Sequence, residues 1–235
     1  AELMESHHYD LVHFDTISLA VYRAQVGNVA TVLDHHNVES HMMLRRSSNE
    51  RNPLAKAYLF YEGYRLREYE RRVCPRFDAH VTCSALDSER LRTVTPGVEA
   101  FVIPNGVDVD YFRPGDGPRQ TRSLVFAGRL SAYSNRQAVL FLGEQVWPRL
   151  RQLYPDLVVV VIGADPPQAL IKLARSEPRF RVHGFVDDVR PYIDQALIYV
   201  CPIKDGGGTK LKILDALAMA KPLVGITELA KETPT

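Results

Sequence analysis

The sequence predicts an α/β protein in which parallel sheets are covered by helices. Short runs of apolar and β-branched residues recur along the chain, and segments with a helical pattern separate most of them. Continuously apolar strands that alternate with helices are typical of parallel sheets, because the crossover helices cover both faces. The chain has 235 residues, of which 46% are hydrophobic, so it can form one large core or two modest cores.

The predicted strands fall into two groups. The first group comprises residues 11–14, 30–33, 79–83 and 100–103, and the second comprises residues 124–127, 157–163, 180–183, 198–201 and 222–225. Between them, residues 112–122 contain two prolines, two glycines and no periodicity, which predicts a domain boundary. We therefore expect an incomplete first domain over residues 1–114 and a doubly wound domain over residues 115–235.

Composition limits the function. The net charge of +1 gives no overall attraction to nucleic acid, so no nucleic-acid partner is expected. Cys74, Cys83 and Cys201 form no C-x-x-C pair, which favours reduced core thiols in a reducing compartment. No apolar run is long enough to span a bilayer, and the first residues lack a signal-peptide pattern. Together these features predict a cytoplasmic protein.

The stretch "PIKDGGGTKLKILDALAMAKPLV", residues 202–224, combines a glycine-rich loop with a helix expected to begin near Thr209. Glycines allow close approach to a ligand, and Lys210 adds charge to the free amides of a helix start, so the loop suits an anion. In the helix, Asp215 lies beside a predicted buried stripe, where it can accept hydrogen bonds from hydroxyls. The predicted stripe consists of Leu211, Leu214, Leu217 and Ala218.

A phosphate at the loop and sugar hydroxyls at the acid together describe a nucleotide. The same residues also fit a flexible turn capped by Thr209 and followed by a solvated Asp215, and the spacing alone leaves both interpretations open. A P-loop is excluded because Thr209 precedes Lys210, and no G-x-G-x-x-G opens a helix.

Four stretches carry a family resemblance: "TVLDHHNVES" (31–40), "VIPNGVDVDYFRP" (102–114), "LVFAGRLSAYSN" (124–135) and the segment from "VHGF" to "KPLV" (182–224). In this order they resemble the retaining glycosyltransferases of family 4, in the bacterial branch with a G-G-G-T-[RK]-x-K-I-L-[ED] motif. The resemblance implies the GT-B architecture of two Rossmann-like domains. It also implies an earlier β-α portion and a C-terminal helix that this sequence does not contain, so we expect a partial chain whose own activity is uncertain.

The resemblance assigns roles to individual residues. His36, Arg129 and Lys210 are implied to be catalytic, with His35 as the alternative to His36. The implied donor-binding residues are Gly128, Arg129, Gly184, Phe185, Gly207, Gly208, Thr209, Lys210 and Asp215. A guanidinium suits phosphate oxygens through paired hydrogen bonds, although Arg129 is also compatible with an ordinary surface position. No cofactor and no metal are implied.

The implied reaction transfers a sugar from a nucleotide diphosphate sugar to an acceptor hydroxyl with retention, in polysaccharide or cell-surface glycan synthesis. The acceptor would be a glycan or a lipid-linked molecule. The sequence departs from the family at two places. Gly207 stands at the position of the first of two acids, which is either missing or displaced to Asp205, and Ser134 and Asn135 replace a frequent lysine. We expect Lys210 to supply the missing charge.

Two other functions are considered. A non-catalytic nucleotide-binding module of the same architecture is compatible with the missing acid. A metal hydrolase built on Asp34, His35, His36 and Glu39 is disfavoured, because adjacent histidines on a strand point to opposite faces.

The segment 61–76 raises a membrane question. It places Arg65, Arg72 and Arg76 near one helix face with Tyr69 between them, which suits contact with the inner face of a membrane. Interspersed glutamates dilute this charge, so a solvated face is favoured over peripheral membrane contact.

Overall fold

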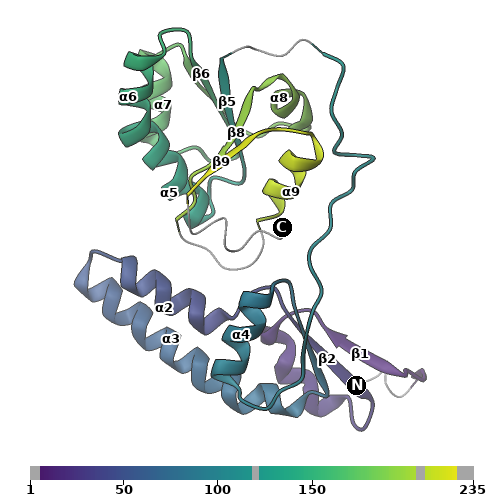
Figure 1. Ribbon diagram of the computed structural model, residues 1–235. Helices are drawn as coiled ribbons and strands as arrows, with labels where there is room; N and C mark the ends of the chain where they lie inside the picture. The colour runs from purple at the N-terminus through teal and green to yellow at the C-terminus, as the bar shows by residue number, and fades with distance from the viewer. Residues whose placement is uncertain (1–5, 118–121, 205–209, 227–235) are drawn as a thin grey trace. The chain divides into compact units, whose positions relative to one another are not determined.

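The computed structural model describes residues 6–117, 122–204 and 210–226, which belong to two compact units (Figure 1). Of the described residues, the first unit covers 6–105 and the second covers 106–117, 122–204 and 210–226. Each unit contains one sheet in which all paired strands are parallel, so the predicted α/β class is confirmed.

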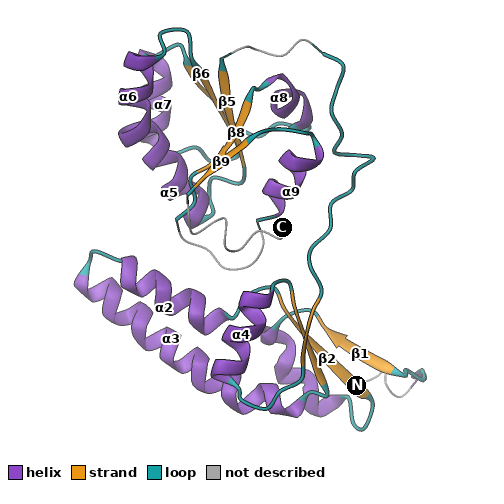
Figure 2. Ribbon diagram, in the orientation of Figure 1, coloured by secondary structure: helices purple, strands orange, loops and turns teal. Residues whose placement is uncertain are grey.

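The first unit has a sheet with the strand order β1-β2-β3-β4, flanked by a long helix pair (Figure 2). Its strands are β1 (Leu11–Phe14), β2 (Ala30–His35), β3 (Ala79–Thr82) and β4 (Ala100–Val102). Its helices are η1 (Ile17–Gln25), α2 (Glu39–Asn49), α3 (Pro53–Val73), η2 (Cys74–Arg76) and α4 (Ala85–Val94). The core includes Phe14 and Phe77, whose rings meet edge to face with centroids 5.0 Å apart.

Local chemistry fixes the α2–α3 pair. Asn52 caps α3 by accepting hydrogen bonds from two backbone amides of its first turn, and Pro53 occupies the first helical position. Gly63 brings α3 against α2, because a Cβ at this position would lie 2.9 Å from the Leu44 side chain. The buried Glu70 of α3 accepts hydrogen bonds from the backbone N–H and the hydroxyl of Ser40, so one helix caps the first turn of the other.

The second unit has a sheet with the order β7-β6-β5-β8-β9. Its strands are β5 (Ser123–Ala127), β6 (Val158–Ile162), β7 (Phe180–His183), β8 (Ile198–Cys201) and β9 (Leu223–Gly225). Its helices are α5 (Tyr133–Phe141), η3 (Leu142–Val146), α6 (Trp147–Leu153), α7 (Gln168–Ser176), α8 (Arg190–Gln195) and α9 (Leu211–Ala218). In Figure 1, α5 to α7 lie on one face of the sheet and α8 and α9 on the other.

The core of this unit lies on both faces of its sheet. Trp147 of α6 is 1% exposed and packs against Phe180 of β7 at a centroid distance of 5.6 Å. On the central strands, the buried Tyr199 hydroxyl donates to the Ala127 carbonyl at 3.0 Å. The neighbouring strands β5 and β8 are therefore joined by a side chain as well as by backbone hydrogen bonds.

The segment that precedes β5 is held by the second unit. The Gly115 N–H donates to Asp194 at 3.0 Å, and the Arg190 guanidinium lies 3.8 Å from the centre of the Tyr111 ring. The compact units divide between Asn105 and Gly106, whereas the loop-like composition pointed to residues 112–122. The composition of residues 112–122 predicts a lack of regular structure, but the side-chain contacts described above determine which unit the segment belongs to.

Candidate functional site

The second sheet has a topological switch point between β5 and β8. From β5 the chain moves to β6 and β7 on one side, while β8 and β9 lie on the other side. Loops that leave the carboxyl ends of β5 and β8 therefore run in opposite directions, and in open α/β sheets this divergence creates the ligand-binding crevice. Gly128 and Arg129 follow β5, and the glycine-rich loop follows β8.

Gly128 and Gly163 bring two of these loops into close backbone contact. The Gly128 N–H donates to the Ile162 carbonyl at 3.0 Å. Gly163, which follows β6, has φ +156°, and a Cβ there would lie 2.0 Å from the Gly128 carbonyl oxygen. Only glycine fits at Gly163, so the edge of the site depends on this residue.

Arg129 is exposed at the end of β5. Its carbonyl accepts a hydrogen bond from the Asn135 side-chain amide at 2.8 Å, which fixes the turn. Its guanidinium makes no hydrogen bond or ion pair within the described part of the chain. The cation is therefore presented at the switch point with its donors open to an anionic ligand.

The glycine-rich loop is described only at its two ends. Gly207, Gly208 and Thr209, three of the predicted donor-binding residues, lie outside the described residues. Lys210 is half-buried and, instead of Thr209, occupies the N-cap position of α9, where its carbonyl accepts from the Ile213 N–H at 2.8 Å. The helix begins at Leu211.

The predicted buried stripe of α9 is wrong. Leu211 and Leu217 are 53% and 48% exposed, while Ile213, Ala216 and Met219 are buried. The apolar residues of this helix are so numerous that two stripes fit the sequence, and the sheet selects the one spaced at 213, 216 and 219.

Asp215 lies on the half-buried border of that face. Burial raises the pKa of its carboxyl group, while the nearby Lys212 ammonium lowers it. Lys212 precedes it by three residues and therefore lies on the same side of the helix. An acid that is partly desolvated but not enclosed is suited to accept hydrogen bonds from ligand hydroxyls.

Lys212 is the residue of this site that the sequence interpretation missed. Its ammonium donates a hydrogen bond to the Asn135 side-chain oxygen and lies 5.0 Å from the centre of the Phe126 ring. A Cβ on Gly128 would approach the ammonium to 2.6 Å, so the charge lies directly against the end of β5. The second and fourth positions after the glycine run, Lys210 and Lys212, both carry lysine, and the sequence spacing gave no reason to prefer Lys212.

Gly184 and Phe185 follow β7 at the same sheet edge. The Gly184 carbonyl accepts from the Gly163 N–H at 3.1 Å, which links the loops after β6 and β7. Phe185 is 77% exposed, an unusual position for a large apolar ring. The arrangement offers an exposed aromatic ring at the same sheet edge as the loops after β5 and β8.

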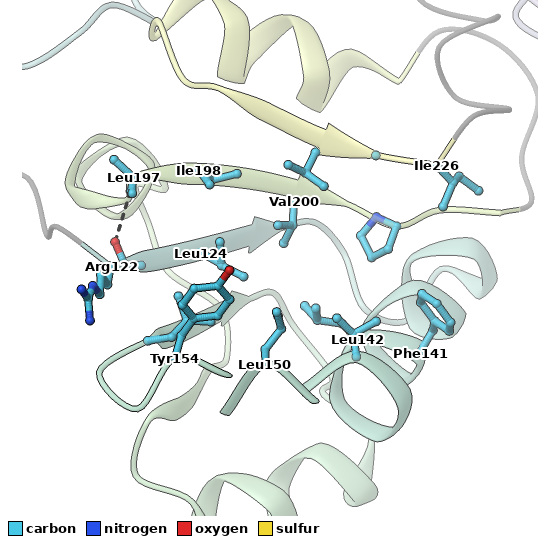
Figure 3. Close-up of a pocket in the computed structure, with 16 residues that line it drawn as sticks. Arg122, Leu124, Phe141, Leu142, Leu150, Tyr154, Leu197, Ile198, Val200 and Ile226 are labelled. Carbon is cyan, nitrogen blue, oxygen red and sulfur yellow. Dashed lines mark hydrogen bonds between the residues drawn. The ribbon is translucent and has the colours of Figure 1, made fainter. Parts of the chain in front are cut away.

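A separate hollow of about 640 Å³ lies on one face of the β5–β8–β9 strands (Figure 3). Its lining includes Leu124, Phe141, Leu150, Ile198 and Val200, and it is almost entirely apolar. Arg122 at its edge is already paired with Asp156 at 3.0 Å, so the switch-point loops are the better candidate for an anionic ligand.

The first unit contains the predicted histidines. His36 follows β2, is exposed, and its Nε2 lies 3.2 Å from Asp15, which follows β1. His35 points the other way, is 2% exposed, and its Nε2 lies 3.0 Å from Nδ1 of the buried His80. His36, and not His35, is therefore accessible to a ligand.

The four residues considered for a metal hydrolase do not converge. Ligand atoms of Asp34 and His36 lie within 4.8 Å of each other and of Asp15, whereas His35 groups with Cys74 and His80 in the core. The alternation of side chains along β2 separates the two histidines, as expected for a strand.

The predicted basic face of residues 61–76 is also revised. Arg76 lies beyond the end of α3, and Tyr69 is partly buried against the core. Arg65 pairs with Glu62 at 3.3 Å, which matches the solvated face that the sequence favoured. Among the described residues, no helix combines enough length and apolar character to cross a bilayer.

Two family models match the chain. A model described as "Glycosyl transferases group 1" matches residues 121–233, and one described as "Glycosyltransferase Family 4" matches residues 1–111. A phosphatidyl-myo-inositol mannosyltransferase of Mycobacterium tuberculosis is 31% identical over 135 residues, or 54% of this chain and 35% of that protein. A Propionibacterium freudenreichii protein of the same name is 28% identical over 170 residues, or 66% of this chain and 41% of that protein. The chain thus spans well under half the length of these relatives.

Solved structures share the fold. The pneumococcal O-GlcNAc transferase GtfA, in complex with UDP and GlcNAc, has a TM-score of 0.67 at 15% identity. The match covers 96% of this chain and 44% of the GtfA chain. HepE of Anabaena, in complex with UDP, has a TM-score of 0.66 at 15% identity. This match covers 95% of this chain and 62% of the HepE chain. Because the two family models match the two halves of the chain and these structures share its fold, the chain has the GT-B fold and each half is similar to a part of a glycosyltransferase.

Proposed function

We propose that this chain forms the donor-binding part and a portion of the acceptor part of a retaining glycosyltransferase. The enzyme would transfer a sugar from a nucleotide diphosphate sugar to an acceptor hydroxyl in polysaccharide or cell-surface glycan synthesis. The observation that carries the proposal is that the open guanidinium of Arg129 and the half-buried carboxyl of Asp215 belong to the segments that follow the neighbouring strands β5 and β8. A diphosphate and the ribose attached to it need these two kinds of group a short distance apart.

Charge stabilisation is the chemical task of the cations. As the glycosidic bond lengthens, negative charge builds on the leaving diphosphate, and fixed positive groups lower the energy of that state. Arg129 offers a planar set of donors that matches phosphate oxygens, and Lys210 adds charge at the start of α9. The family resemblance supports this role for both residues.

The nucleoside end of the donor is assigned to Asp215 and Phe185. Asp215 accepts hydrogen bonds from the ribose hydroxyls, which a partly desolvated carboxylate does more strongly than a solvated one. Phe185 offers an exposed ring on which a base stacks, and Gly184 leaves room beside it. The solved relatives named above were crystallised with UDP, which makes uracil the first base to test.

His36 is proposed to act at the reacting sugar. Asp15 holds one ring nitrogen of this exposed histidine at 3.2 Å, which fixes the ring and leaves the other nitrogen for a sugar hydroxyl. The acceptor class is a glycan or a lipid-linked molecule, and the names of the mannosyltransferase relatives favour a lipid-linked acceptor. Peripheral contact with the inner face of a membrane belongs to this part of the proposal.

Transfer is proposed to proceed without a metal ion. Asp108 and Asp110 form a D-x-D sequence, but the Asp108 carboxylate accepts hydrogen bonds from the backbone N–H groups of Asp110 and Tyr111 at 3.0 and 2.9 Å. This carboxylate serves a turn in the segment before β5. A chelator should therefore leave nucleotide binding and sugar transfer unchanged.

The test is calorimetric binding of UDP, GDP and inorganic pyrophosphate to this chain. Arg129→Ala should weaken all ligands that bind by about tenfold to a hundredfold, the value of hydrogen bonds to a charged group. Arg149→Ala, which removes an exposed arginine of α6, is the matched control and should bind like the unmodified chain. Asp215→Ala should weaken a nucleoside diphosphate and spare pyrophosphate, and equal losses for both would contradict the ribose role.

Transfer itself is tested by release of the nucleoside diphosphate from its sugar conjugates, with lipid extracts or oligosaccharides as acceptors. Binding without release, in this chain and in any longer form of the protein, would favour the non-catalytic module. Failure of UDP, GDP and pyrophosphate to bind at all would refute the donor site.

A further inference from the structure

Lys212 lies between the carboxyl ends of β5 and β8. Its ammonium lies against Gly128 at the end of β5, while Cys201 at the end of β8 is near enough to affect its charge. This position lies at the switch point, where β5 and β8 end and the loops that follow them run in opposite directions. The side chain reaches there from the second residue of α9.

The surroundings of this ammonium leave its charge without a close counterion. Within the described residues its hydrogen-bond partner is the neutral amide of Asn135, and it forms no ion pair. Burial therefore lowers the pKa of Lys212 to about 8, even though Cys201 and Asp215 act in the opposite direction. A half-buried cation with one neutral partner is costly for the fold, and an anionic ligand would remove that cost.

Asn135 fixes the position of the ammonium. Its amide nitrogen donates to the Arg129 carbonyl at 2.8 Å, and its oxygen accepts from Lys212. One side chain thus ties α9 to the turn that carries Arg129. Gly128 is equally necessary, since any larger residue would place its Cβ 2.6 Å from the ammonium.

The sequence led us to expect that Lys210 replaces a charge missing at Ser134 and Asn135. The structure places Lys212 in hydrogen-bond contact with Asn135. The two lysines are two residues apart and therefore project in different directions from the start of α9.

We propose that Lys212, positioned by Asn135 and given room by Gly128, binds the diphosphate of the donor together with Arg129. The assignment rests on the proposed function, because it needs a nucleoside diphosphate at the switch point. It makes Lys212 a binding residue of that site and reduces Lys210 to a more distant electrostatic role.

A pH dependence follows for wild-type binding. If the bound diphosphate requires a charged Lys212, its dissociation constant should rise about tenfold between pH 7 and pH 9, as the ammonium loses its proton in the free protein. The other groups that act on Lys212 are Lys210, Cys201 and Asp215. Cys201 stays a neutral thiol in this range, since burial raises its pKa.

The experiment compares Lys212→Met, Lys210→Met and Lys172→Met by calorimetry with UDP, GDP and inorganic pyrophosphate. Lys172 is an exposed lysine of α7, so its variant controls for loss of one positive charge. We expect Lys212→Met to weaken pyrophosphate and nucleoside diphosphate at least tenfold at pH 7 and to abolish the rise in dissociation constant at pH 9. Lys210→Met should weaken binding less and keep the pH dependence.

A second variant protects the test against misfolding of Lys212→Met. Gly128→Ala keeps the lysine but displaces its ammonium, and it should also weaken pyrophosphate at least tenfold while the melting temperature stays close to that of the wild type. Wild-type affinity in either folded variant, or a pH dependence that persists in Lys212→Met, would overturn the assignment and leave the donor site itself intact. If the wild type bound neither UDP, GDP nor pyrophosphate, the proposed function itself would be refuted.

Discussion

Replacing Gly163 by alanine should unfold the second unit at a markedly lower temperature. The residue has φ +156°, a region that alanine adopts at a cost of about 1–3 kcal/mol. Its added Cβ would lie 2.0 Å from the Gly128 carbonyl oxygen, a backbone atom that cannot rotate away. Forcing the two loops apart adds a further ~1–3 kcal/mol, so the total loss is about 4 kcal/mol.

The lone tryptophan provides the assay. Trp147 is buried in the core of the second unit, so its fluorescence during urea or thermal unfolding reports on that unit. A loss of this size corresponds to a fall in melting temperature of about 15 °C for a unit of roughly 120 residues. Gly128→Ala is the matched comparison, and its change should stay below about 1 kcal/mol, because its Cβ meets only the end of a flexible lysine.

The comparison is sharp because the two glycines are neighbours in space. Equal stability of the two alanine variants would refute the reasoning from close backbone contact. A loss confined to Gly128→Ala would show that the lysine, and not the backbone, limits the space between these loops.

Three other predictions concern single residues. Phe185→Ala should weaken UDP about tenfold in calorimetry and leave pyrophosphate unchanged, because only the base uses the ring; an equal effect on both would argue against stacking. Burial lowers the pKa of His35 from 6.5 to about 3, so the unfolded chain binds a proton between these values that the folded chain does not. Stability should therefore be complete above pH 6.5 and fall by about 2 kcal/mol from pH 7 to pH 5 in urea unfolding followed by circular dichroism, and His35→Leu should flatten that fall. Glu70→Ala should cost about 2 kcal/mol in the same assay, because the Ser40 N–H and hydroxyl lose their acceptor, whereas Glu68→Ala at an exposed position should cost little.

The strands were predictable because their signal is local. Val158–Ile162 reads as four valines and an isoleucine, a run that fits only a strand buried on both faces. The switch point followed less directly, since strand order depends on which helix covers which face and not on any single run. Once the order β7-β6-β5-β8-β9 is known, the loops after β5 and β8 become the expected place for a ligand.

Side-chain direction was not predictable in the apolar helix α9. Leucines at 211, 214 and 217 follow helical spacing as well as Ile213, Ala216 and Met219 do, and only packing against the sheet distinguishes them. The same ambiguity hid Lys212, because the direction of a lysine near a helix start depends on which face is buried. Asn135 gave no signal at all, since its role depends on a residue that lies far from it in the sequence.

The rotation of α9 explains why a carboxylate lies in an otherwise apolar helix. With Ile213 and Ala216 turned into the core, Lys212 and Asp215 fall on the border between the buried face and the sheet edge. A helix turned so that Leu211 and Leu214 were buried would bury Asp215 more deeply and turn Lys212 away from β5. The polar pair therefore requires the less obvious of the two apolar stripes, and the core selects the rotation that presents an ammonium and a carboxylate, three residues apart, at the same switch point.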